Sequence, residues 1–293
     1  MSVTTDFSER TDFVLDVVAK PDGSIISKSR SLWSKMMDSD GFRRAGVLIA
    51  LAIVWQAYAV FVHNELVLPK LTDVLFALWK STASGVLPAR TWNSLQTLLT
   101  GYAVGIGLGV VITTAAITSR IGSDFLATLT AMFNPLPAIA LLPLAMLWFG
   151  LGKGSVLFVL AHSVLWPFAL NTHAGYLAVS ETLRMAGRNC GLYPLQYVMR
   201  VLMPAALPSI ISGLKISWAF GWRTLIAAEL VFGASSSGGG VGWYIFEKRN
   251  DLDIPEVFAG LLVIVIIGLI MEGVVFRLLE QNTVRKWGMV RSM

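Results

Sequence analysis

Charged side chains lie inside an otherwise apolar stretch at about residues 208–232, where they could pair with one another or bind an ion. Arg223 and Glu229 lie within this stretch, and Lys215 lies near one end, where its long side chain can reach water. Ionisable groups in such surroundings are costly, so they are usually paired or face a cavity. Because Arg223 and Glu229 are six residues apart, they point to different faces of one helix. Two interpretations remain open for Arg223: an ion pair with another helix, and contact with an anion.

Polar but uncharged side chains lie in the neighbouring apolar stretches. Asn134, His162 and Asn171 are of this kind, and we expect them to hydrogen-bond across helix–helix contacts, with solute binding as the alternative. The chain has 3 histidines, and their wide separation does not match the ligand spacing of a metal site. No arrangement of Ser, His and Asp stands out as a catalytic triad. The sequence therefore predicts neither a metal centre nor a catalytic site.

The composition indicates that these side chains are surrounded by a lipid bilayer. The chain has 293 residues, of which 55% are hydrophobic and 14% are charged, and its mean hydropathy is +0.67. A soluble domain carries about 25% charged residues. The apolar runs are close to the ~20 residues that a helix needs to cross the hydrocarbon core, whereas barrel strands would alternate over segments of about ten residues. We therefore predict an all-α, polytopic membrane protein.

The apolar runs predict about six transmembrane helices. They cover approximately residues 45–63, 92–117, 124–149, 155–178, 208–232 and 256–279. With the N-terminus inside, the segments that face the cytoplasm hold roughly twice as many Lys and Arg residues as the outer segments, as the positive-inside rule requires. The chain then divides into a cytoplasmic N-terminal tail (1–44), a transmembrane domain (45–288) and a C-terminal tail (289–293).

Prolines and glycines predict how two of these helices depart from regular packing. In the third span, Pro135, Pro137 and Pro143 each remove a backbone donor and would kink or break the helix. In the second span, glycines recur every four residues and form a flat strip on one helix face: Gly101, Gly105 and Gly109. Such a strip allows another helix to approach closely, either within the bundle or at a subunit interface. Ordinary intramembrane glycine is the alternative.

A short amphipathic segment, LYPLQYVMRVLMPAALP at residues 192–208, separates the fourth and fifth spans on the predicted cytoplasmic side. Its apolar side chains recur at helical spacing: Leu192, Leu195, Val198 or Met199, and Leu202. Pro194 is tolerated in a first helical turn, whereas Pro204 and Pro208 are expected to end the helix and redirect the chain. We therefore predict a short rigid helix that is attached at both ends to transmembrane helices.

The residues that lead into this helix resemble the cytoplasmic loop of ABC-importer permeases. In that family the loop reads Glu-Ala-Ala, three residues, Gly, nine residues, Ile-x-Leu-Pro. Here Met-Ala-Gly at 185–187 is followed by Gly191 and then by Val-Leu-Met-Pro at 201–204, with the same spacing. The departures are Met185 for the glutamate, Gly187 for the second alanine and Met203 for the leucine. Glu181, one helical turn before Met185, is a candidate to replace the missing glutamate.

The resemblance extends over about residues 45–288. Within the family, the chain resembles the nitrate/sulfonate/taurine/bicarbonate branch of permeases. The segments that carry it are NPLPAIALLPLAMLWFGLG (134–152), NTHAG (171–175), GLKISWAFGWRTLIAAEL (213–230) and GVGWYI (240–245). It implies a type I ABC-importer permease fold with a cytoplasmic coupling helix, in the inner membrane of a bacterial cell. The solute would be a small anion such as nitrate, sulfonate, taurine or bicarbonate. Candidate residues of the translocation pathway are Asn134, His162, Asn171, Arg223 and Glu229.

The resemblance also implies partners. Two permease chains, expected here to be a homodimer, would form the pathway, while cytoplasmic ATPase subunits receive the coupling helices and an external binding protein delivers the solute. ATP and Mg would be held by the ATPase, because in FGLGKGS (149–155) Gly154 follows Lys153 where a P-loop requires Ser or Thr. No cofactor is therefore expected in this chain. The residues expected to contact the ATPase are Ala186, Arg188, Gly191, Gln196 and Arg200.

Two other functions remain as alternatives to this interpretation. An ion-gradient-driven secondary transporter would tend to show two related halves and paired intramembrane carboxylates, and the sequence shows no clear repeat. A membrane scaffold that transports nothing would need neither the proline-broken third span nor the spaced cytoplasmic loop. The sequence therefore favours the permease, although it does not identify the solute.

Overall fold

The computed structural model describes residues 40–232 and 239–286, and all regular elements of this part are helical. Most of the predicted N-terminal tail, the whole C-terminal tail and part of the Gly-Ser segment lie outside these residues. Backbone contacts divide the chain into two units, residues 1–53 and 54–293. The described part of the first unit is the beginning of one helix, and the second unit holds all the sites discussed below.

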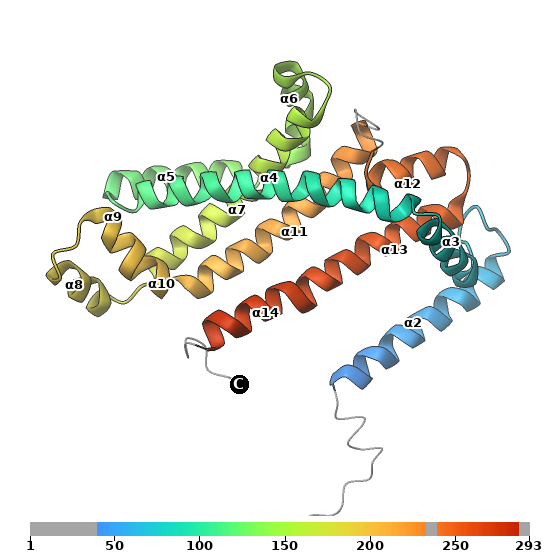
Figure 1. Cartoon of the computed structure of the whole chain (residues 1–293), viewed down its shortest axis with the longest axis horizontal. Coiled ribbons are helices and arrows are strands. Elements are labelled where there is room, and N and C mark those ends of the chain that lie inside the picture. Colours follow the sequence, from blue (N-terminus) through green and yellow to red (C-terminus); the bar gives the residue numbers. More distant parts are fainter. Residues whose placement is uncertain (1–39, 233–238, 287–293) are drawn as a thin grey trace, which may run out of the picture. The chain divides into compact units, whose positions relative to one another are not determined.

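The helices follow one another with short connections. In chain order they are α2 (Asp40–Val62), α3 (Leu71–Ala83), α4 (Val86–Ala116), α5 (Arg120–Phe133), η1 (Ala138–Leu141), α6 (Leu142–Phe149), α7 (Lys153–Leu177), α8 (Glu181–Asn189), α9 (Pro194–Tyr197), η2 (Val198–Leu202), α10 (Met203–Ala205), α11 (Leu207–Phe232), α12 (Val241–Asn250), α13 (Ile254–Ile270), η3 (Met271–Phe276), α14 (Arg277–Glu280) and η4 (Gln281–Arg285). Helices α8, α9 and α10 gather at one end of the second unit, and α3 and α12 gather at the other (Figure 1).

Four helical stretches in the described residues are long and apolar enough to cross a membrane, and the number rises to six if each bent helix pair counts as one span. The four are Ala45–Val62, Val86–Ala116, Lys153–Leu177 and Ile254–Val284. The first bent pair is Arg120–Phe133 with Ala138–Phe149, which meet at 87°. Its break contains Pro135 and Pro137, so the predicted interruption of the third span is confirmed. The polytopic all-α class, with about six spans, is also confirmed.

Helix α7 is the most buried of these spans, because it packs against both α4 and α11. The glycine strip of α4 faces α7: a Cβ atom on Gly101 would lie 2.7 Å from Leu160, and one on Gly105 would lie 2.8 Å from Val164. A Cβ atom on Gly109 would lie 2.5 Å from the Phe168 ring. The strip is therefore a packing seam within the bundle. The sequence had left open whether it lies within the bundle or at a subunit interface.

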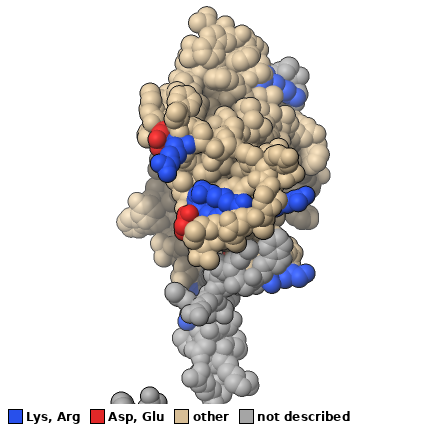
Figure 2. Space-filling model, turned by 90° about the vertical axis from the view of Figure 1, so that its left-hand side faces the viewer, with Lys and Arg blue, Asp and Glu red and all other residues tan. Residues whose placement is uncertain are grey.

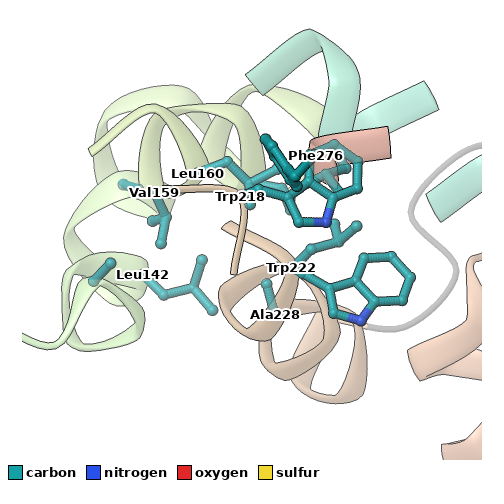
Figure 3. Close-up of a cluster of buried hydrophobic side chains, with 12 residues drawn as sticks. Leu142, Val159, Leu160, Trp218, Trp222, Ala228 and Phe276 are labelled. Atoms are coloured by element: carbon teal, nitrogen blue, oxygen red, sulfur yellow. The ribbon is translucent and has the colours of Figure 1, made fainter. Parts of the chain in front are cut away.

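Aromatic side chains fill the space where α4, α7 and α11 meet. Trp218 and Trp222 of α11 are each 6% exposed, and they pack with Leu160 of α7 and Phe276 of η3 (Figure 3). The hydroxyl of Tyr102, on α4, donates a hydrogen bond of 2.9 Å to the Leu214 carbonyl on α11. Apolar burial alone does not bring helices together in lipid, so tight packing and bonds of this kind hold the three helices in position.

A polar network joins α3, α12 and α13 at the far end from α8. The Tyr244 hydroxyl donates to Ser81 Oγ at 3.0 Å and lies 3.2 Å from a Glu256 carboxylate oxygen. The Lys248 ammonium lies 2.8 Å from the same carboxylate, and this hydrogen bond raises the pKa of Lys248. Burial raises the pKa of Tyr244 to about 12. Lys248 therefore stays charged and Tyr244 neutral at physiological pH, so the network keeps its bonds.

The α4–α7 seam predicts a difference between two neighbouring glycines. A methyl group on Gly105 meets Val164 and the Ala161 carbonyl oxygen, at 2.8 and 2.9 Å, whereas one on Gly107 meets nothing within 4 Å. We expect Gly105→Ala to destabilise the protein by about 1–3 kcal/mol, as overpacking does, and Gly107→Ala to leave stability unchanged or slightly raised. Thermal unfolding of the purified variants in detergent measures this. Equal melting temperatures would show that the seam is not tightly packed.

Candidate functional site

The segment between α7 and α11 folds as two short helical parts joined by a turn. Helix α8 ends at Asn189, and Gly191 has φ +67°, a left-handed conformation that glycine adopts without strain. Pro194 begins α9, as expected, and η2 continues it as a π-helix. The predicted rigid helix is therefore present from Pro194 to Ala205, and the following helix α11 leaves it at 78°.

The prolines of this segment differ in their effect from the prediction. Pro204 does not end the helix, because it lies within α10, and the break falls two residues later at Ala206. The π-helical turn that precedes Pro204 gives room for its ring, which in a regular α-helix would clash with the carbonyl group four residues earlier. Pro208 lies in the first turn of α11, where its missing N–H costs nothing. The two prolines thus flank the bend.

The apolar stripe of the segment is also narrower than predicted. Val198 and Leu202 are each 1% exposed and pack with Tyr176 and Ala206. Leu195 and Met199 are each 57% exposed. A π-helix has more residues per turn than an α-helix, so the α-helical spacing did not predict which side chains share a face. The buried pair fixes the segment to α7, and the exposed pair remains available to a partner.

The five residues expected to contact the ATPase are all exposed. They are Ala186, Arg188, Gly191, Gln196 and Arg200. The end of the unit that carries α8–α10 shows more basic than acidic side chains (Figure 2). Met185, which stands in place of the glutamate of the family pattern, is 51% exposed, and Glu181 is exposed as well. This surface is accessible to a protein partner, and its positive charge suits an acidic one.

Arg184 attaches α8 to the end of α7. Its guanidinium donates to the Tyr176 carbonyl at 2.6 Å and to the Val179 carbonyl at 3.1 Å. These carbonyls lie at the C-terminal end of α7, where a cation is also favoured by the helix dipole. The sequence analysis missed this residue. The signal that could have found it is a basic side chain soon after the predicted end of a span.

Gly187 brings α8 close to the following helix. It is buried, and a Cβ atom there would lie 2.9 Å from the Tyr197 ring and 3.0 Å from Val201. The alanine of the family pattern would therefore press against Tyr197 in this chain. Because Gly187 has no Cβ atom, the Tyr197 ring can pack directly against α8. The two helical parts of the segment are therefore in close contact.

A cavity of about 420 Å³ lies between the broken third span, α7 and α11. Three predicted pathway residues line it: Asn134, His162 and Arg223. Trp166 lines it as well, and its ring stacks on Phe133 with centroids 4.9 Å apart. The sequence analysis missed Trp166, although it lies four residues after His162 and hence on the same helix face.

Four polar atoms in the side chains that line this cavity lack a protein partner in the part of the chain that the structure describes. Asn134 Oδ1, both ring nitrogens of His162 and Trp166 Nε1 are buried without a hydrogen bond. No described carboxylate lies within 4 Å of the Arg223 guanidinium. Buried polar groups are normally bonded to protein, water or a ligand. The lining of the cavity thus holds one cation, Arg223, beside residues whose buried polar atoms are unbonded.

The other two predicted pathway residues lie outside this lining. Glu229 accepts hydrogen bonds from Ser94 Oγ at 2.8 Å and from the Gly242 N–H at 2.9 Å. Its carboxylate therefore holds the first turn of α12 against α4 and α11. The Asn171 amide donates to the Pro167 carbonyl at 2.7 Å within α7. In the described residues, no group of three or more His, Cys, Asp or Glu side chains could hold a metal ion.

Known proteins are similar in sequence to most of this chain. It is 30% identical over 241 residues to the taurine transport system permease protein of Escherichia coli (strain K12), which covers 78% of this chain and 83% of that protein. It is 31% identical over 190 residues to the nitrate import permease protein of Synechocystis sp. (strain PCC 6803), which covers 64% and 66%. Residues 102–285 match the family described as binding-protein-dependent transport system inner membrane component. The chain belongs to this family and is thus a multi-pass membrane permease of an ABC importer.

Proposed function

We propose that this permease moves a small anion through the cavity at Arg223 and that a separate ATPase drives it through α8–α10. The observation that carries the proposal is one continuous connection. Arg184 bonds the exposed segment to the end of α7, and α7 places His162 and Trp166 in the cavity. A partner that displaces the segment would therefore displace a wall of the cavity.

The anionic character of the solute follows from the cavity and agrees with the relatives. Arg223 is the lining residue that carries a full charge, and the rest of the lining is mostly apolar with a few neutral polar side chains. A guanidinium binds oxyanions through paired N–H groups. The similar permeases named above are described as transporting taurine, which is a sulfonate, and nitrate. We therefore propose a sulfonate, taurine, nitrate or bicarbonate as the solute.

The partners follow from the same proposal. ATP and Mg are bound and ATP is hydrolysed by cytoplasmic ATPase subunits, which contact Ala186, Arg188, Gly191, Gln196 and Arg200. A solute-binding protein delivers the anion at the outer end, near α3 and α12. A second copy of this chain completes the pathway, as the resemblance to ABC-importer permeases implies. This assembly is the homodimeric arrangement expected from the sequence.

An uptake experiment tests the source of energy. We expect proteoliposomes that contain the permease and its ATPase to accumulate solute in their interior when ATP is enclosed and the binding protein is outside. Omission of the ATPase should abolish uptake, and a proton or sodium gradient should not restore it. Accumulation driven by a gradient alone would favour a secondary transporter.

The Arg184 contact predicts a variant that docks but does not transport. Hydrogen bonds to charged groups contribute about 1.5–3 kcal/mol, so Arg184→Gln should loosen α8 from α7. We expect the ATPase to co-purify normally while uptake per ATP hydrolysed falls roughly tenfold, which corresponds to about 1.4 kcal/mol. Arg184→Lys should recover part of the loss, because an ammonium group also donates to carbonyls.

Arg188→Gln is the matched control for this variant. Arg188 is exposed on the same helix, and we place it in the ATPase contact, so its loss should weaken co-purification instead. If Arg184→Gln transports with the wild-type ratio of solute to ATP, the Arg184 bonds do not transmit the displacement.

The cavity predicts a second pair of variants. Arg223→Gln should lower the maximal rate of anion uptake at least tenfold, because it removes a charge-assisted bond of about 1.5–3 kcal/mol. Lys215→Gln removes a cation from the same helix, but Lys215 pairs with Glu272 at 2.9 Å and does not line the cavity. Its uptake rate should stay within about twofold of wild type, and equal losses in both variants would place the anion elsewhere.

A further inference from the structure

Leu252 has a backbone conformation that leucine rarely adopts. It lies in the turn between α12 and α13 and has φ +59°, in the left-handed region, where a Cβ atom comes too close to the following carbonyl oxygen. In the described residues, one other non-glycine residue has a positive φ, His63. The His63 ring bonds the Phe61 carbonyl, with 2.9 Å between Nδ1 and the oxygen, and histidine enters this region more often than most residues do. The Leu252 side chain has no polar group to form such a bond, so its conformation is strained.

The end of α12 requires this conformation at position 252. The helix closes with a Schellman motif, in which the Leu252 N–H donates to the Arg249 carbonyl at 3.1 Å and the Asp253 N–H donates to the Lys248 carbonyl at 3.0 Å. The residue that such a motif places in the left-handed region is usually glycine, because glycine has no Cβ atom. The fold alone would therefore favour glycine at this position.

The Leu252 side chain does not offset the strain by packing within the described residues, since it is 68% exposed. Its neighbours Arg249, Asn250 and Asp251 are exposed as well, and charged side chains are costly in the hydrocarbon core. The turn therefore lies outside the hydrocarbon core, and lipid chains do not cover Leu252. Strain of this kind persists where it serves a function, and an apolar side chain among charged ones is typical of the centre of a protein contact.

The turn also holds Leu252 in a fixed position. The Lys248 ammonium lies 2.8 Å from the Glu256 carboxylate and thereby joins α12 to α13. The Asp253 side chain caps α13 by accepting a hydrogen bond from the Glu256 N–H. A contact group that is already fixed loses little conformational freedom when a partner binds. Leu252 is therefore preorganised to enter a recess in a partner.

The position of the turn identifies the partner. The α12–α13 turn and α8–α10 lie at opposite ends of the second unit (Figure 1), and the proposed function places α8–α10 on the cytoplasmic side. We infer that Leu252 anchors the contact with the solute-binding protein, which covers it with an apolar recess bordered by polar groups. This inference rests on the proposed function and names a residue of the contact through which the solute is delivered.

Helix α12 connects this anchor to the helix that carries Arg223. The Gly242 N–H, in the first turn of α12, donates to the Glu229 carboxylate of α11 at 2.9 Å. Glu229 lies six residues after Arg223 on the same helix. A binding protein that displaces the turn would therefore also act on a wall of the Arg223 cavity.

A glycine substitution separates docking from folding. Leu252→Gly removes the anchor and relieves the strain, so the melting temperature of the permease–ATPase complex in lipid nanodiscs should stay equal or rise. We expect the concentration of binding protein that half-maximally stimulates ATP hydrolysis to rise more than about tenfold, as loss of a contact anchor does. The binding protein is loaded with taurine or nitrate, whichever it binds. Basal ATP hydrolysis should not change, whereas a purely structural role of Leu252 would alter it.

Two further variants are the controls. Leu252→Met keeps an apolar side chain of similar volume, so the half-maximal concentration should stay within about threefold of wild type. Leu278 is 51% exposed near the opposite end of the same apolar stretch, Ile254–Val284. Leu278→Ala removes an exposed leucine away from the proposed contact and should match wild type within about twofold.

The outcomes separate this inference from the proposed function. An unchanged half-maximal concentration for Leu252→Gly would overturn the inference, and so would a lower melting temperature, because Leu252 would then serve the fold. A melting temperature that falls in nanodiscs but not in detergent would assign the side chain to lipid instead. Each of these results leaves the proposed function intact if wild-type proteoliposomes accumulate the anion with ATP. If the binding protein does not stimulate the wild type, the proposed function fails and the inference fails with it.

Discussion

Helix α7 is held between two helices by contacts in which glycine occupies places that no side chain could fill. On the α4 side these are Gly101, Gly105 and Gly109, and on the α11 side Gly221 approaches Val164 so closely that a Cβ atom would lie 3.0 Å away. Val164 thus touches glycines of both neighbours. In lipid the helices gain little from hiding apolar surface, so close packing of this kind is what holds them together. Helix α7, which contains Pro167 in its interior, is therefore restrained on both sides by close packing.

Helix α7 connects the two parts of the candidate site. Tyr176, whose carbonyl accepts from Arg184, is ten residues from Trp166, and at 1.5 Å per residue the two lie about 15 Å apart along the axis. Helix α11 begins directly after the bend at Ala206 and carries Arg223. Both helices that bring polar groups to the cavity are thus attached to the same exposed segment, one at each of its ends. A displacement of that segment would change two walls of the cavity together.

Local patterns in the sequence predicted the features that depend on neighbours along the chain. The four-residue spacing of the glycines predicted the seam, and Pro135 and Pro137 predicted the break after α5, because both effects arise from the backbone itself. The exposure of Leu195 and Met199 was not predictable, since a π-helical turn changes which side chains share a face. The bonds of Glu229 to Ser94 and Gly242 were equally hidden. They join residues far apart in sequence, and a single sequence does not show which helices are neighbours.

The pairing of charged side chains distinguishes Arg223 from the other ionisable residues of α11. Lys215 has Glu272 as a partner, and Glu229 is bonded by a hydroxyl and a backbone N–H. For Arg223, residues 40–232 and 239–286 supply no carboxylate within ion-pair distance, and its side chain lines the cavity. The described residues thus supply no partner for the first of the two interpretations, an ion pair with another helix, and contact with an anion stays a prediction. One cation among neutral groups attracts an anion but binds it less tightly than a cluster of cations would, and a permease must release what it binds.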